Sequence, residues 1–102
     1  MAERHLETIS THARYRLAQR NLSQADIDYV LRYGRLIRNA RACFVYLGRR
    51  DIPRVDHNIS ERMRLEGTVL VLDPFTGSHL TTAYRNRRTG IRDIKRKGKH
   101  SG

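Results

Sequence analysis

The sequence is poor in residues that build covalent or metal-bearing scaffolds, with one cysteine, no tryptophan and two prolines in 102 residues. A single cysteine excludes a disulfide framework and a cysteine-based metal site. Because Cys43 lies in the apolar run Ala42–Leu47, we expect it to be buried as a small hydrophobic residue. No apolar run approaches the ~20 residues of a membrane-spanning helix. The charged segment Met1–Glu7 does not resemble a secretory signal. We therefore expect a cytoplasmic protein without a membrane partner.

Acidic residues are also scarce, since 10 Asp and Glu stand against 21 Lys and Arg, for a formal net charge of +11. The resulting positive field attracts polyanions, and nucleic acid, RNA in particular, is the partner that we favour. A hydrophobic content of 38% indicates one folded domain, which we place at residues 1–88.

The positive charge is concentrated at the C-terminal end. Residues 85–102 hold eight Lys or Arg and one acidic residue, with few apolar side chains. We therefore expect residues 89–102 to form a basic tail that is flexible when unbound. The predicted nucleic-acid contacts, most of them in or near this tail, are Arg14, Arg87, Arg88, Arg92, Lys95, Arg96, Lys97 and Lys99.

Two helices are predicted at the N-terminal end. Ile9, Ala13 and Leu17 recur every four residues and indicate a helix over Thr11–Arg20. In the second helix Ser23 is the expected N-cap, with Asp26 three residues later to complete a capping box. We expect the second helix to end at Gly34 with a left-handed glycine.

After Gly34 the pattern changes to short segments rich in branched and aromatic residues, which are typical of strands: Leu36–Ile37, Cys43–Leu47, Val69–Leu72 and Leu80–Tyr84. Asp73–Gly77 predicts a hairpin turn. Arg49–Gly67 is a polar loop in which we expect one helical turn around Ser60–Arg64. The predicted fold is α+β, with two N-terminal helices packed on a four-stranded antiparallel sheet.

His12, Arg16 and Arg20 are spaced four residues apart, so they form one ridge on the first predicted helix. An imidazole can act as a general acid or base near neutral pH, and guanidinium groups pair with phosphate oxygens. This combination suits RNA cleavage. The alternative is a solvated basic helix face with a histidine near its start.

A second candidate lies where the last strand ends in Tyr84 and Arg85. Strand alternation predicts that Tyr84 shares the face of Leu80 and Thr82, and that Arg85 lies on the other face. Tyr84 could stack on a base, or it could be a core or edge tyrosine.

The third candidate, the loop Arg49–His57, is better explained by local pairing of arginine with aspartate. The five histidines have no metal-ligand spacing, and no glycine-rich phosphate loop is present. We therefore expect neither a metal nor a cofactor.

The segment Ser10–Ser23, with its HAxxRxxxR pattern, and the segment Thr82–Arg85 resemble a bacterial family of small domains of unassigned function. Arg50–Pro53 and Leu65–Gly67 are similar to pieces of some members, and the resemblance extends over about Thr8–Arg87. That family is grouped with the RelE-like toxins and the barnase and colicin type of ribonuclease fold.

The resemblance implies a RelE-like arrangement of helices on a four-stranded antiparallel sheet and a metal-independent ribonuclease or its descendant. The matching positions are His12, Arg16, Arg20, Tyr84 and Arg85.

Three functional hypotheses follow. The first is a toxin-like endoribonuclease that cleaves messenger or ribosomal RNA by 2′-OH transesterification, with His12 as general acid or base. Arg16 and Arg20 would stabilise the phosphorane, and Tyr84 would stack or relay a proton. The second is a non-catalytic RNA- or DNA-binding module driven by the basic tail. The third is a partner-binding protein whose tail meets an acidic protein such as an antitoxin.

Overall fold

The computed structural model describes residues 6–39 and 41–86. Its helices are α1 (Thr11–Gln19), α2 (Gln24–Tyr33) and α3 (Ser60–Met63), and its strands are β1 (Thr8–Ile9), β2 (Arg35–Arg38), β3 (Cys43–Tyr46), β4 (Thr68–Leu72) and β5 (His79–Arg85). The predicted tail lies outside the described residues, as do seven of the predicted nucleic-acid contacts: Arg87, Arg88, Arg92, Lys95, Arg96, Lys97 and Lys99.

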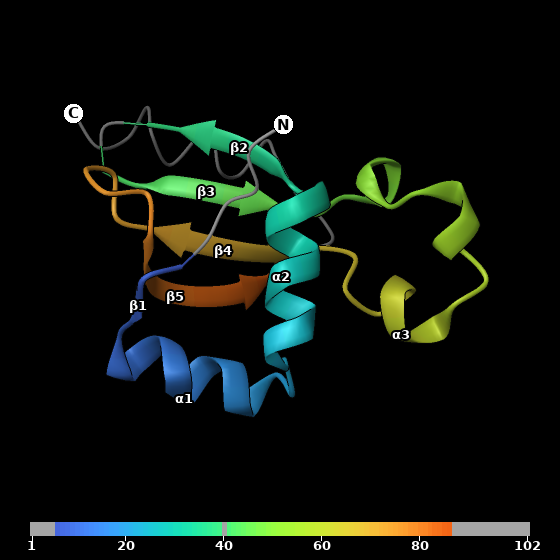
Figure 1. Ribbon diagram of the computed structural model, residues 1–102, viewed down its shortest axis with the longest axis horizontal. Coiled ribbons are helices and arrows are strands. Elements are labelled where there is room, and N and C mark those ends of the chain that lie inside the picture. Colours follow the sequence, from blue (N-terminus) through green and yellow to red (C-terminus); the bar gives the residue numbers. More distant parts are fainter. Residues whose placement is uncertain (1–5, 40, 87–102) are drawn as a thin grey trace.

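The sheet has five strands in the order β1-β5-β4-β3-β2, and it is mixed (Figure 1). Strands β2 to β5 pair antiparallel, whereas β1 runs parallel to β5 with Thr8 opposite His79 and Ile9 opposite Leu80. The predicted RelE-like architecture of two helices on a four-stranded antiparallel sheet is therefore wrong. Strand β1 was missed because two residues are too few to show a period of two.

Both N-terminal helices begin where the sequence indicates. The Ser10 side chain accepts a hydrogen bond from the amide of Ala13. At the start of α2, Ser23 and Asp26 form the predicted capping box, with bonds of 2.9 and 3.2 Å between each backbone amide and the other side chain. A third helix, α3, lies within the loop at the position of the expected helical turn.

Gly34 ends α2 as predicted, but for a different reason. Its φ of −67° is not left-handed. A Cβ atom at this position would lie 2.5 Å from the carbonyl oxygen of Val30 and 2.7 Å from a methyl carbon of Val45. Glycine is required here because the backbone of α2 meets the sheet too closely for any side chain.

The main core fills the space between the two N-terminal helices and one face of the sheet. Ala13 and Leu17 of α1 and Ile27 and Val30 of α2 pack there with buried strand residues. Cys43 is 3% exposed within this core, which confirms the expected burial. Figure 1 shows α2 across the sheet and α1 beside β5, so the last turn of α1 lies near the end of β5.

Candidate functional site

The pairing of β5 with β4 contains an irregularity that changes which sheet face the later residues of β5 occupy. Val71 lies opposite Thr82 while Leu72 lies opposite Leu80, so Thr81 is an extra residue in β5. Its side chain donates a hydrogen bond of 3.0 Å to the carbonyl oxygen of Val71. Such a bulge reverses the side-chain alternation beyond it.

Tyr84 therefore does not share the face of Leu80, and that part of the prediction is wrong. It does share the face of Thr82, because these two residues lie opposite Val69 and Val71 of β4. Leu80 and Ala83 pack in the core beneath the helices, whereas Tyr84 packs with residues of the opposite sheet face. Arg85 follows on the helix side, in register with the buried Thr68 of β4. Although they lie on opposite faces of the sheet, these two neighbouring residues at the end of the strand both border one site.

A pocket of about 190 Å³ lies where α1 and β5 end, lined by Gln19, Arg20, Leu22, Thr68, Tyr84 and Arg85. Three of the five predicted catalytic residues, Arg20, Tyr84 and Arg85, thus meet in one place. Arg20 is an exposed residue of this lining. The lining also includes one aliphatic residue, Leu22, the aromatic Tyr84, and the neutral polar residues Thr68 and Gln19.

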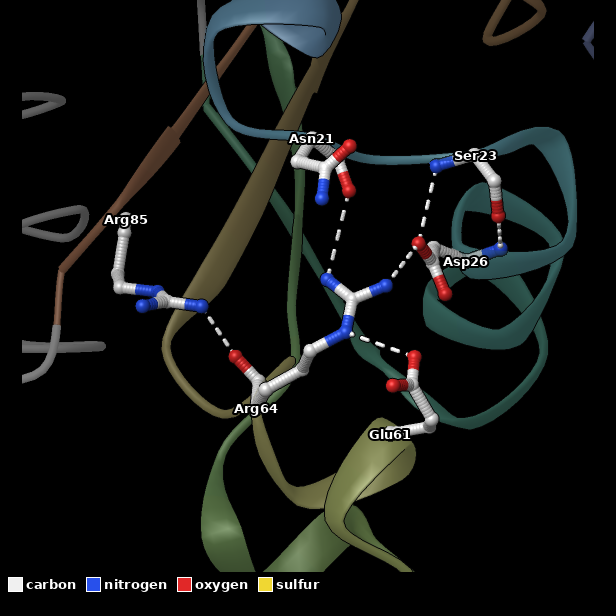
Figure 2. Close-up of polar contacts among 6 residues, drawn as sticks. All are labelled: Asn21, Ser23, Asp26, Glu61, Arg64 and Arg85. Atoms are coloured by element: carbon white, nitrogen blue, oxygen red, sulfur yellow. Dashed lines mark hydrogen bonds and ion pairs between the residues drawn. The ribbon is translucent and has the colours of Figure 1, made fainter.

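Arg64, which sequence reasoning missed, contacts the pocket residue Arg85 (Figure 2). Arg85 donates a hydrogen bond to the backbone carbonyl oxygen of Arg64. The Arg64 guanidinium contacts Asp26 at 2.5 Å and Glu61 at 3.2 Å. Arg64 also donates a 3.5 Å bond to the carbonyl oxygen of Asn21, in the turn between α1 and α2. It therefore ties the loop before β4 to the start of α2.

The charge of Arg64 is balanced locally. Burial alone would raise the pKa of Asp26, but hydrogen bonds from Ser23 and Arg64 outweigh it and hold that pKa below its ordinary value. The hydrogen bond to Asp26 in turn raises the pKa of Arg64. Arg64 is thus committed to a structural ion pair, and the cations that line the pocket are Arg20 and Arg85.

His12 and Arg16 do not line this pocket. His12 is exposed in the first turn of α1, eight residues before Arg20, which is a rise of about 12 Å along a helix. The Arg16 guanidinium donates a hydrogen bond of 3.3 Å to the side-chain oxygen of Gln19, a pocket residue. Arg14, a predicted nucleic-acid contact, is exposed on the same helix.

The loop Arg49–His57 serves the structure. Asp51 pairs with Arg35 of β2 at 3.1 Å, so its partner lies outside the loop. Asp56 accepts a hydrogen bond of 2.6 Å from the Tyr29 hydroxyl. Burial and this neighbouring carboxylate raise the pKa of Tyr29 to about 12. These contacts fix the loop, but the partners of Asp51 and Asp56 in them are not the arginines of the loop that the sequence predicted.

Within residues 6–39 and 41–86, no group of three or more His, Cys, Asp or Glu side chains lies close enough to hold a metal ion. In the same part of the chain, no helix is long and apolar enough to cross a membrane.

Of the residues that shape the pocket, Arg64, Thr68 and Gln19 carried no recognisable signal in the sequence. Arg64 is one of many arginines in a polar loop. The one indication in the sequence is that Glu61 precedes it by three residues, a spacing that allows a local ion pair. Thr68 is the first residue of a strand whose other members are aliphatic.

Comparison with known proteins identifies the family. No curated protein and no solved structure matches the chain. Residues 9–85 match DUF4258, a domain of unknown function, which agrees with the expected resemblance to a small-domain family of unassigned function. Because the match spans most of the chain, the protein belongs to the DUF4258 family.

Proposed function

We propose that this protein binds RNA and that the pocket between α1 and β5 seats a phosphate group of the RNA backbone. The observation that carries the proposal is the convergence of Arg20, Arg85 and Tyr84 on one small pocket. A guanidinium group pairs with two phosphate oxygens at once, and a tyrosine ring offers a surface on which a neighbouring base can stack.

The size of the pocket also favours this ligand. Sites for whole cofactors or metabolites commonly measure ~300–1,000 Å³. A pocket of about 190 Å³ is smaller and suits one phosphate group with part of a sugar or base. The rest of a bound strand would lie on the surface, where the net charge of +11 attracts it. The motifs of Ser10–Ser23 and Thr82–Arg85 resemble a small-domain family that is grouped with RelE-like toxins, and this grouping favours RNA over DNA.

Binding is tested with a fluorescent single-stranded RNA whose Kd is measured by anisotropy at several salt concentrations. Arg20→Gln should weaken binding roughly tenfold or more, because a charged hydrogen bond is lost. It should also reduce the salt slope by about 0.7, the value expected for one single-strand phosphate contact. The matched control is Arg54→Gln, which removes an exposed arginine from a 3-10 turn distant in sequence from the pocket.

Tyr84 provides a second, independent variant. Tyr84→Phe keeps the ring and should bind within about twofold of the wild type, whereas Tyr84→Leu should lose ~1–3 kcal/mol of stacking. Equal weakening by Arg20→Gln and Arg54→Gln would show that only net charge matters and would overturn the assignment of the pocket.

RNA cleavage is a second candidate, favoured by one observation. The ridge His12–Arg16–Arg20 ends at the pocket, and Gln19 links Arg16 to it. In this reaction the 2′-OH attacks the adjacent phosphorus while a base takes its proton. The bond from phosphorus to the 5′ oxygen breaks as an acid protonates that oxygen, leaving a 2′,3′-cyclic phosphate and a 5′-OH. The scissile phosphate would lie nearer to Arg16, because His12 is about 12 Å from Arg20 along the helix.

The test is incubation with RNA in EDTA, beside His12→Ala, Arg16→Ala and an all-DNA strand of the same sequence. Cleavage by the wild type alone, with DNA intact, supports catalysis. Intact RNA in every lane, or equal cleavage by all variants, excludes this role of His12 and leaves the binding proposal unaffected.

A further inference from the structure

The sheet face turned away from the main core is apolar over β2, β3, β4 and the end of β5. We name it the outer sheet face, and its members are Ile37, Ala42, Phe44, Tyr46, Val69, Val71 and Tyr84. Strands β3 and β4 read Cys-Phe-Val-Tyr and Thr-Val-Leu-Val-Leu, so apolar residues point to both faces. Strands with one face in water alternate between apolar and polar residues, whereas continuous apolar runs are typical of strands covered on both faces.

The burial of individual residues on the outer sheet face points the same way. Val69 is 0% exposed and Phe44 is 7% exposed. Tyr46 and Tyr84 lie opposite Val69 on the two neighbouring strands, so they shield it only from the sides. Within the described residues this cluster holds only strand residues and Ala42, since the residues of α1 and α2 pack in the other cluster. A second layer is needed to bury such a face.

We propose that the layer over the outer sheet face is the chain's own segment 87–102, docked through Ile91 and Ile94. The segment follows Asn86 directly in the sequence, and Tyr84, two residues earlier, belongs to the face at its β5 side. Its sixteen residues are long enough to cross four strands, which at ~4.8 Å spacing span about 15 Å. Ile91 and Ile94 are its two large aliphatic side chains, and the Lys and Arg around them would stay in water.

This docking does not depend on RNA binding and has a consequence for it. The segment would lie against Tyr84, which also borders the pocket, and its cations would extend the positive surface around Arg20 and Arg85. The basic segment would then be part of the folded domain, in contrast to the flexible tail expected from its composition.

The direct test is NMR on the full chain without RNA, with isoleucine and valine methyl groups labelled. We expect nuclear Overhauser contacts between the methyl groups of Ile91 or Ile94 and those of Val69 or the ring of Phe44. A variant that combines Ile91→Asn with Ile94→Asn should lose these contacts and lower Tm by at least ~4 °C. The matched control combines Thr89→Asn with Ser101→Asn, which places the same neutral side chains in the same segment and should leave Tm unchanged.

Other occupants of the face give distinct results, each of which overturns the proposal. Ile91 and Ile94 methyl signals at random-coil positions, with no contact to the sheet, would show an undocked segment. Contacts that appear only between differently labelled chains in a mixed sample would assign the face to a second copy. Resonances of Phe44 and Val69 that shift only on adding a short single-stranded RNA, with the isoleucines undocked, would assign it to bases.

Discussion

Replacement of Arg64 by methionine tests whether this residue stabilises the fold or binds ligand. Arg64→Met keeps the aliphatic part of the side chain but removes the contacts to Asp26 and Glu61. A hydrogen bond to a charged group contributes about 1.5–3 kcal/mol. The Arg64 side chain is 33% exposed, so solvent screening reduces this contribution. Glu61 is 76% exposed and adds only a few tenths of a kcal/mol. We expect a loss of about 1–2 kcal/mol in the free energy of unfolding near pH 7.

The loss of unfolding free energy in Arg64→Met should become smaller as the pH is lowered. The pKa of Asp26 in the folded protein lies below its ordinary value, partly because of Arg64. Such a carboxylate stabilises the folded state above its unfolded pKa, and this stabilisation disappears as the pH falls through the folded pKa. Without Arg64 the pKa of Asp26 rises and less stabilisation remains to be lost. The difference between wild type and variant is therefore largest at pH 6–7 and shrinks below the ordinary pKa of 3.8.

The assay is urea unfolding followed by circular dichroism at pH 6.5 and pH 3.0. Glu61→Gln is the matched control, and its cost should stay below about 0.5 kcal/mol at both pH values. A gap between wild type and Arg64→Met that is equally large at pH 3.0 would refute the argument from Asp26. RNA affinity of the folded variant should stay within about twofold, because Arg85 is held by the carbonyl oxygen of Arg64 rather than by its guanidinium group.

Three further substitutions test the frame around the site by thermal and denaturant unfolding. Gly34→Ala should cost more than about 2 kcal/mol, since its Cβ would lie 2.5 Å from the Val30 carbonyl oxygen; a neutral result would contradict the close approach. Ser23→Ala should cost about 1 kcal/mol through the lost cap, and unchanged stability would count against the capping box. Tyr29→Phe should cost about 1 kcal/mol through the lost bond to Asp56. Because the pKa of Tyr29 is raised to about 12, its contribution is full below pH 10 and is lost as the pH rises toward 12, which a spectrophotometric titration would detect.

Local features of the fold were predictable because their causes are local. The capping box of Ser23 and Asp26 depends on two residues three positions apart, and the sequence alone locates the start of α2. The hairpin between β4 and β5 was equally clear from Asp73–Gly77, and Gly77 does adopt a positive φ of 67°. The parallel pairing of Thr8 with His79 joins positions 71 residues apart, and no pattern in either segment encodes it.

The site was predictable only where a motif carried it. Arg20, Tyr84 and Arg85 were named from the sequence, and they meet in the pocket. The prediction that Tyr84 shares a face with Leu80 was wrong because the bulge at Thr81 lies between them and breaks the period of two. Threonine is common in regular strands, so the sequence gives no sign of this bulge.

The contrast between Arg64 and Arg20 shows why charge counts alone cannot assign a binding site. Both residues are arginines beside the same pocket, so removing either changes the net charge by the same amount. Arg64 is neutralised by Asp26 and Glu61, whereas Arg20 lines the pocket. We therefore expect opposite outcomes: Arg64→Met loses stability and keeps affinity, and Arg20→Gln keeps stability and loses affinity. A long-range field alone would weaken binding equally in the two variants, so only local geometry explains a difference between them.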